Sequence, residues 1–117
     1  MKKFRDLKIW QRSHTLTLEI YRITKDFPSS ELYGLVSQMR RSSSSIPTNI
    51  AEGCGRNTEK DFARFLDNAM GSASEFEYQL ILAYDLKYIP QVTYEKTNAE
   101  LTEIKRMLNA FIQKLRN

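Results

Sequence analysis

The feature that most constrains this chain is Pro47, which lies inside an otherwise helical pattern. Apolar or small residues recur every three or four positions around it, the spacing of one face of a helix packed in a bundle. Because proline lacks the amide hydrogen that would bond to the Ser43 carbonyl, we expect the helix to kink or restart there. The serines at 42–45 are predicted to satisfy the freed carbonyl through their hydroxyls, and Gly53 and Gly55 to end the helix. The pattern is carried by Leu32, Val36, Met39, Ser43, Ile46 and Ile50.

The rest of the chain has the same helical periodicity, so the predicted fold class is all-α. We expect helices over about 7–25, 29–53, 58–86 and 93–115, with Thr58 and Asp61 capping the third. Short linkers favour antiparallel neighbours, so residues 1–117 are predicted to form a single domain, an antiparallel up-down-up-down four-helix bundle. The predicted core contains Leu35 or Val36, together with Phe65, Phe76, Leu80, Ile104, Leu108 and Phe111.

The first helix has more apolar surface than one core requires. Its apolar residues form two stripes, one from Leu7 to Tyr21 and one from Ile9 to Ile23. One stripe can serve the core of the bundle, and the other is predicted to meet a second subunit. The sequence does not decide which stripe does which. The candidate oligomer-interface residues are therefore taken from both stripes: Ile9, Trp10, His14, Leu16, Ile20 and Tyr21.

Two further stretches are unusual for a solvated helix. On the polar side of the Pro47 helix, a row of short polar groups forms a candidate structural motif made of Ser45, Asn49, Glu52 and Gly53. Asn49 and Glu52 are expected to make specific hydrogen bonds or an ion pair, within the bundle or to a neighbouring subunit; the alternative is a solvated face. The third helix has small residues at 69–74, where we expect another surface to pack closely against Gly71.

Little in the sequence points to catalysis, and an enzyme is not expected. His14 is the only histidine and lies on an apolar stripe, where a packed or interface role is favoured over that of a base. Cys54 is the only cysteine, so we predict no internal disulfide and no cysteine-rich metal site. With one histidine and no Glu-x-x-His motif, no other metal site is expected, and no cofactor is predicted. The Cys54 thiol is either exposed in a loop or structural. No signal peptide or membrane-spanning run is found, so a cytoplasmic location is expected.

One set of residues, spread along most of the chain, forms a recognisable pattern: Phe27-Pro28, Glu31, Gly34-Leu35, Gln38, Arg40-Arg41, residues 45–53, Gly71-Ser72 and Glu75. Together these residues resemble a known family, the four-helix-bundle proteins encoded within intervening sequences of bacterial 23S ribosomal RNA. The resemblance implies a ring-like homopentamer, and for that family no activity is established. A related bundle of similar shape, the accessory variability protein of diversity-generating retroelements, binds nucleic acid and a reverse transcriptase. Ser42 and Ser43 depart from the family pattern, which usually has alanines there.

Two functions remain open. The chain carries a net charge of +4 and a pI near 9.3, which is compatible with a nucleic-acid-binding accessory protein, with RNA as the favoured ligand. Such a protein is expected to contact phosphates, since no base-reading motif is present. The alternative is a structural or protein–protein interaction module, whose partner is another protein. The candidate nucleic-acid-binding residues are Lys2, Lys3, Arg5, Lys8 and Arg12 near the amino terminus, and Arg40, Arg41, Arg56, Lys60 and Arg64 around the corner between the second and third helices.

Overall fold

The computed structural model describes residues 3–117, and within them the chain forms four long helices and no strand. The predicted all-α class is confirmed, and the first, third and fourth helices begin and end within two residues of the predicted positions. The second is preceded by two short turns, η2 (Ser29–Glu31) and η3 (Leu32–Val36), and η1 (Phe4–Asp6) precedes the first. The long helices are α1 (Lys8–Thr24), α2 (Ser37–Cys54), α3 (Glu59–Asp85) and α4 (Gln91–Arg116).

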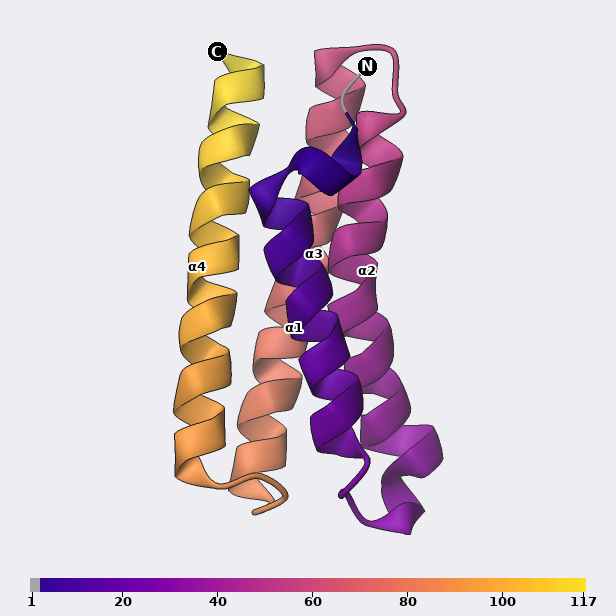
Figure 1. Cartoon of the computed structure of the whole chain (residues 1–117), viewed down its shortest axis with the longest axis vertical. Helices are drawn as coiled ribbons and strands as arrows, with labels where there is room; N and C mark the ends of the chain where they lie inside the picture. The colour runs from indigo at the N-terminus through magenta and orange to yellow at the C-terminus, as the bar shows by residue number, and fades with distance from the viewer. Residues whose placement is uncertain (1–2) are drawn as a thin grey trace.

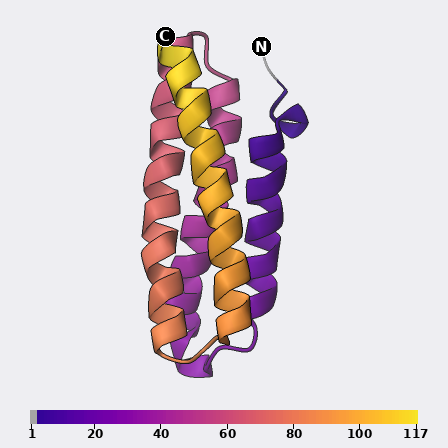
Figure 2. The same ribbon diagram turned by 90° about the vertical axis from the view of Figure 1, so that its left-hand side faces the viewer.

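The four helices lie side by side and alternate in direction, in a molecule of 43 × 23 × 20 Å (Figures 1 and 2). Helix α1 packs against α2 and α4, and α3 packs against the same two helices from the other side. The described N-terminal residues, the C-terminus and the α2–α3 loop lie together at one end, here called the terminal end. The α1–α2 and α3–α4 connections lie at the opposite end.

Helix α2 does not restart at Pro47 but passes through it as one α-helix. The carbonyl that proline leaves without its usual donor belongs to Ser43, and the Thr17 hydroxyl of α1 lies 3.0 Å from it. The same hydroxyl is 3.0 Å from the Ser13 carbonyl, so its single hydrogen is shared between two acceptors. The predicted serine hydroxyls do not perform this task. The hydroxyls of Ser42, Ser43 and Ser44 lie instead within hydrogen-bonding distance of the carbonyls three residues earlier, as Ser43 Oγ does with Arg40.

The end of α2 also differs from the prediction. Gly53 lies inside the helix rather than beyond it, and no glycine among the described residues has a positive φ. A Cβ added to Gly53 would lie 2.7 Å from a ring carbon of Phe62 and 3.1 Å from Cβ of Phe65. Glycine is therefore required there for the close approach of α3. Cys54 is the last residue of α2 and is buried, which corrects the expectation of an exposed loop thiol and supports the structural alternative.

Small residues bring α2 and α3 close together along their length. Ala69 and Ala73 of α3 are fully buried, and α2 and α3 share the most extensive contact between any two helices of the bundle. Ser42, one of the two serines that depart from the family pattern, donates a hydrogen bond of 2.6 Å to Oε1 of the buried Gln79. Because a buried amide without a partner is costly, the hydroxyl has a clear role that alanine would lack.

The connection before α2 is held by one carboxylate. Glu31 accepts a hydrogen bond from the backbone of Leu35, and its second oxygen accepts one from the Tyr88 hydroxyl at 2.9 Å. This bond is the main cause that raises the pKa of Tyr88 above its ordinary value. Gly34 between them has a non-helical conformation, φ −106° and ψ −111°, and an added Cβ would lie 2.9 Å from Glu31 Oε1. The Phe27 ring packs against Tyr88 with centroids 5.2 Å apart.

The core agrees with the prediction except at the end of α4. Leu35, Val36 and the other predicted residues are buried, but Phe111 is only half-buried and packs its ring edge against Phe62. Ile112 is buried in place of Phe111. Near the C-terminal end of α4, the buried face is therefore displaced by one residue from the predicted pattern. The predicted cap of α3 is confirmed, since Thr58 Oγ1 accepts a hydrogen bond of 3.1 Å from the Asp61 amide.

Replacing the Thr17 hydroxyl is expected to destabilise the fold. In Thr17→Val the shape is retained, but the Ser43 carbonyl loses its partner inside the α1–α2 contact, so the free energy of unfolding should fall by about 1–3 kcal/mol. Thr48→Val is the matched control: its hydroxyl bonds to the Ser44 carbonyl on an exposed face, and a change within about 0.5 kcal/mol is expected. Urea unfolding followed by circular dichroism measures both. Equal effects would show that the Ser43 carbonyl does not depend on Thr17.

Candidate nucleic-acid interface

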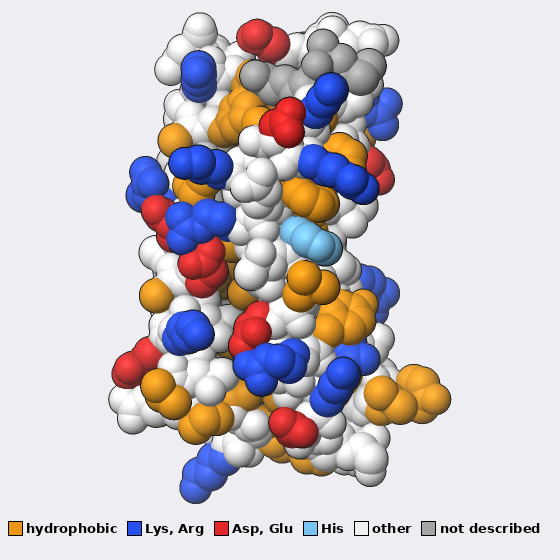
Figure 3. Space-filling model, in the orientation of Figure 1, with side chains coloured by type: hydrophobic (Ala, Val, Ile, Leu, Met, Phe, Trp, Pro, Cys, Tyr) orange, Lys and Arg blue, Asp and Glu red, His pale blue; other side chains and the backbone are white. Residues whose placement is uncertain are grey.

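The terminal end gathers most of the basic residues predicted to bind nucleic acid. Lys3, Arg5 and Lys8 are exposed around the start of α1, and basic side chains are visible near that end in Figure 3. Lys2 lies outside the described residues. The α2–α3 loop contributes Arg56 to the same end, because α2 finishes where α1 begins. Segments that are far apart in the sequence thus present cations to one region of the surface.

Two arginines at the α2–α3 corner are held in place by an aromatic ring. The guanidinium carbons of Arg56 and Arg64 lie 4.5 and 4.6 Å from the centroid of Phe65. Asp61 pairs with Arg64 at 2.8 Å and approaches Arg56 at 3.8 Å. A guanidinium has five N–H donors, so these contacts orient both arginines and leave donors directed to solvent. Phe65 itself is buried and provides a fixed platform.

A hollow of about 360 Å³ lies beside this corner. Lys60 and Arg64 line it from α3, and Arg116 lines it from the end of α4. Arg116 also pairs with Asp67, and hydrogen bonding to that carboxylate raises the pKa of the guanidinium. Sequence reasoning missed Arg116 and its exposed neighbour Lys114. In a bundle with an even number of alternating helices, the C-terminus lies at the same end as the N-terminus. This rule would have placed both residues at the terminal end.

Three of the predicted basic residues lie elsewhere. Arg41 precedes Cys54 by thirteen positions along α2, which is about 20 Å at the usual helical rise, so it is not at the α2–α3 corner. Arg40 beside it bonds to Thr24 Oγ1 at 3.0 Å and stacks over the Tyr21 ring. Arg12 is engaged across the bundle by Glu100, with both contacts at 2.9 Å. These three residues do not join the cluster at the terminal end.

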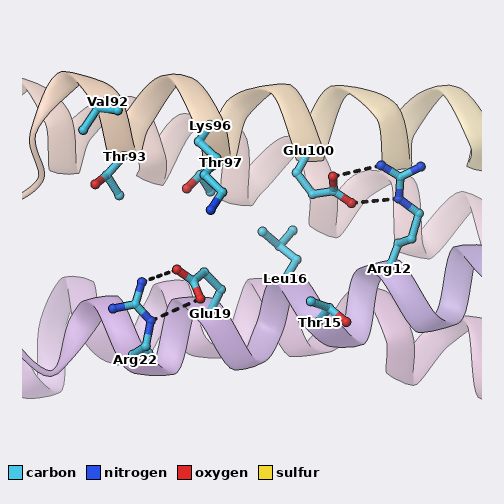
Figure 4. Close-up of a pocket in the computed structure, with 10 residues that line it drawn as sticks. All are labelled: Arg12, Thr15, Leu16, Glu19, Arg22, Val92, Thr93, Lys96, Thr97 and Glu100. Atoms are coloured by element: carbon cyan, nitrogen blue, oxygen red, sulfur yellow. Dashed lines mark hydrogen bonds and ion pairs between the residues drawn. The ribbon is translucent and has the colours of Figure 1, made fainter.

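The groove between α1 and α4, of about 510 Å³, is bounded by ion pairs (Figure 4). The Arg12–Glu100 pair closes one end, and Glu19 with Arg22 lies toward the other. Hydrogen bonding to Glu100 raises the pKa of Arg12, and hydrogen bonding from Arg22 lowers the pKa of Glu19. A lowered carboxyl pKa means that this pair persists at neutral pH and weakens only as the pH falls toward the folded-state value. Both carboxylates are thus engaged by arginines.

The polar row on α2 makes hydrogen bonds at only part of its length. The Asn49 amide donates to the Ser45 carbonyl at 2.9 Å and to Ser45 Oγ at 3.1 Å. The Ser72 hydroxyl of α3 donates to Ser45 Oγ at 2.9 Å, so the row connects α2 to α3. Glu52 is exposed, and no hydrogen bond or ion pair of its carboxylate is found within residues 3–117. Gly53 serves the packing described above.

The structure separates the two apolar stripes of α1. Ile9, Leu16 and Ile20 are buried in the subunit's own core, so their assignment as interface residues is corrected. Trp10 is half-buried and stacks on the exposed His14, with ring centroids 4.9 Å apart. Tyr21 and His14 belong to the outward stripe, which is the one left available to a second subunit. His14 is thus exposed rather than packed in the core.

No group of three or more His, Cys, Asp or Glu side chains that could hold a metal ion occurs in the part of the chain that the structure covers. In the same residues, no helix is both long enough and apolar enough to cross a membrane.

Comparison with known proteins supports the sequence resemblance. The sequence model of one family, described as 23S rRNA-intervening sequence protein, matches residues 5–110. A crystal structure described as a protein of unknown function from the S23 ribosomal protein family of Bacteroides thetaiotaomicron is similar to this chain. It has a TM-score of 0.83 and 29% sequence identity, and the alignment covers 90% of this chain and 95% of that one. A search among curated proteins finds no match.

The polar row yields a test with an internal control. Asn49→Ala removes the two donated bonds and disturbs the Ser45–Ser72 contact, so the free energy of unfolding should fall by about 0.5–1.5 kcal/mol. Glu52→Ala removes an exposed side chain and should change it by less than about 0.5 kcal/mol. Urea unfolding at equal protein concentration compares the two. A larger loss for Glu52 than for Asn49 would point to a partner for Glu52 outside the subunit.

Proposed function

This chain belongs to the 23S rRNA-intervening sequence protein family, and we propose that it is a non-enzymatic, homo-oligomeric, cytoplasmic protein that binds RNA through basic side chains at its terminal end. The observation that carries the proposal is the arginine pair of the α2–α3 corner. Arg56 and Arg64 are oriented by Phe65 and Asp61 beside the exposed Lys60. Fixed guanidiniums with free donors are suited to phosphate oxygens, which they contact in a bidentate manner.

Phosphate contacts account for affinity but not for sequence preference. The exposed cations of the terminal end are long and flexible apart from the Phe65 pair, and the described chain has no strand that could form an RNA-binding sheet. Binding is therefore expected to tolerate different sequences and to favour structured RNA, whose phosphates are dense and ordered. Arg116 and Lys114, which the alternating helices bring to the same end, extend the basic surface.

Assembly would multiply this surface. The family resemblance implies an antiparallel bundle assembled as a ring-like homopentamer, and five subunits of net charge +4 would carry about +20 together. A ring repeats the terminal-end cluster by symmetry, so each subunit needs to supply only two or three phosphate contacts. The exposed apolar residues of α1, Leu18 and Tyr21, support association, because such side chains are usually covered.

The second candidate is an interaction module for another protein. It is favoured by Tyr33, whose side chain is 93% exposed next to the exposed Leu32. Aromatic side chains of this kind often anchor protein interfaces. In this alternative the basic surface serves solubility, and the acidic residues interspersed with it, such as Asp61 and Asp67, break it into mixed patches.

A salt titration tests the RNA proposal. Labelled structured RNA and duplex DNA are titrated with the protein from low to physiological salt, and the logarithm of the affinity should fall by about 0.7–0.9 per neutralised phosphate for each decade of salt. The double variant Arg56→Gln/Arg64→Gln should bind more weakly and show a slope shallower by about 1 for each lost phosphate contact. The matched control, Arg22→Gln/Lys96→Gln, removes two cations near the opposite end and should change binding little.

Three outcomes would contradict the proposal. Absence of binding to either nucleic acid at low salt would leave the protein-interaction module. Affinity that does not change with salt would exclude the phosphate mechanism. Equal losses in the two double variants would show that net charge matters and the α2–α3 corner does not.

A further inference from the structure

An open pocket of about 620 Å³ lies where the end of α1 meets the start of α2. It is here called the Tyr33 pocket, and its polar and aromatic lining consists of Tyr21, Tyr33, Ser37, Arg40, Arg41 and Ser44. None of the described residues that line it is acidic. In Figure 3, basic and hydrophobic side chains lie next to one another at the lower right, over the parts of α1 and α2 that Figure 1 shows there. The pocket therefore combines aromatic rings with positive charge.

Tyr33 presents the open ring of this pocket. Its side chain is 93% exposed, and no hydrogen bond of its hydroxyl is found within residues 3–117. The turn that carries it is fixed, because Gly34 has a non-helical conformation and the Glu31 carboxylate accepts a bond from the Leu35 amide. A large aromatic side chain on a fixed backbone, with its ring open to solvent, is a platform on which a nucleic-acid base can stack.

The two arginines of the pocket are held differently. Arg40 bonds through Nε to Thr24 Oγ1 at 3.0 Å, and its guanidinium carbon lies 4.7 Å from the centroid of the Tyr21 ring. These contacts fix Arg40 and occupy one face of Tyr21, so Tyr33 is the more open of the two rings. Arg41 is exposed, and no ion pair or hydrogen bond of its guanidinium is found in the described part of the chain. One fixed and one uncommitted guanidinium next to an open ring suit a phosphate attached to an aromatic base.

Two hydroxyls share the surface of α2 that carries these arginines. Ser37 and Ser44 each lie three or four positions from both arginines, so all four side chains are on one side of the helix. The Ser44 hydroxyl lies 3.2 Å from the Arg41 carbonyl, and Ser37 is exposed. Hydroxyls both donate and accept, so they match the ribose 2′-hydroxyl that distinguishes RNA from DNA. The pocket thus has a partner for each part of a ribonucleotide.

A peptide fits this pocket less well than a nucleotide does. An extended peptide binds along the edge of a sheet, and a peptide helix binds in an apolar groove. The described chain has no strand, and Leu32 and Val36 are the only aliphatic side chains among the described residues that line the pocket. The open ring and the two arginines, in contrast, match a flat base and its phosphate.

We infer that the Tyr33 pocket binds an unpaired nucleotide of single-stranded RNA, with the base stacked on Tyr33 and the adjoining phosphate held by Arg40 and Arg41. The inference rests on the proposed function for the choice of RNA and adds a second, separate site to it. Arg41 lies about 20 Å along α2 from the α2–α3 corner, at the usual helical rise. A structured RNA held by its phosphates at the terminal end would therefore bind more tightly when an unpaired segment beside it reaches the pocket.

The experiment compares a short labelled single-stranded RNA with the same strand annealed into a duplex. Tyr33→Ala removes the platform and should weaken binding of the single strand by about 5- to 150-fold, the effect of losing one stacked base. Tyr33→Phe keeps the ring and should bind as the wild type does. Neither variant should change duplex binding, because paired bases are not available to the ring. A fluorescent purine analogue in the single strand reports stacking directly, and its emission should change with wild type and Tyr33→Phe but not with Tyr33→Ala.

The phosphate contact has its own pair of variants. Arg41→Gln removes the uncommitted guanidinium and should weaken binding of the single strand and make its salt slope shallower by about 1. Lys96→Gln is the matched control, since it removes an exposed cation of α4 outside the pocket and should change neither quantity. Light scattering should give every variant the mass of the wild type.

Three results would overturn the inference. Tyr33→Phe might lose as much affinity as Tyr33→Ala, which would exclude stacking, and equal losses in Arg41→Gln and Lys96→Gln would exclude a local phosphate contact. A Tyr33→Ala protein that differs in mass from the wild type would assign the ring to a contact between subunits.

The variant Arg56→Gln/Arg64→Gln separates the pocket from the proposed function. Structured RNA that depends on these two arginines, together with unchanged single-strand binding in Tyr33→Ala, refutes the pocket alone. Single-strand binding that depends on Tyr33, together with full binding of structured RNA by the double variant, refutes the terminal-end site alone. Absence of binding to any RNA at low salt refutes both.

Discussion

The carbonyl of Ser43 is the group on which the arrangement of α1 and α2 depends. Pro47 removes its usual donor, and a backbone carbonyl cannot remain unpaired between two packed helices without a large cost. Thr17 supplies the donor from α1. The bond between the Thr17 hydroxyl and the Ser43 carbonyl fixes the position of α1 along the axis of α2. Two turns further along α1, the bond from Arg40 to Thr24 supports the same relative position. This relative position of the two helices also determines which way the outward stripe of α1 faces.

On the side of α2 that faces α3, close packing depends on a glycine, which has no side chain. Gly53 lets Phe62 and Phe65 of α3 approach closer than any larger residue would allow. Phe65 in turn supports the guanidiniums of Arg56 and Arg64. Gly53 was predicted to end the helix, but it instead allows Phe65 to pack closely against α2. Phe65 in turn orients the two arginines of the α2–α3 corner. Gly53 therefore affects both the packing of α2 against α3 and the positions of the charged side chains at the α2–α3 corner.

Helical periodicity was sufficient to predict the four helices and nearly all of the core, and a local capping pattern predicted the cap at Thr58, because these features depend on residues close in sequence or on a repeated spacing. It did not predict Thr17 as the partner of Ser43, since that contact needs the relative height of two helices. The irregular turn at Gly34 has no periodic signal either; it follows from Glu31, which bonds to both Leu35 and Tyr88. The basic residues were found by composition, but their grouping required the direction of each helix.

Helix α1 contributes to the stability of the subunit and also carries the exposed apolar residues proposed to meet a second subunit. Its contact with α4 is the sparsest between neighbouring helices and includes the Arg12–Glu100 ion pair. A neighbouring subunit on the outward stripe would bury Leu18 and Tyr21 of α1, so dilution of such an oligomer would remove that contribution to stability. Salt screens ion pairs between subunits as well as contacts between cations and phosphates. A decline of RNA affinity with salt therefore reports phosphate contacts only over the range of salt in which the oligomer remains assembled.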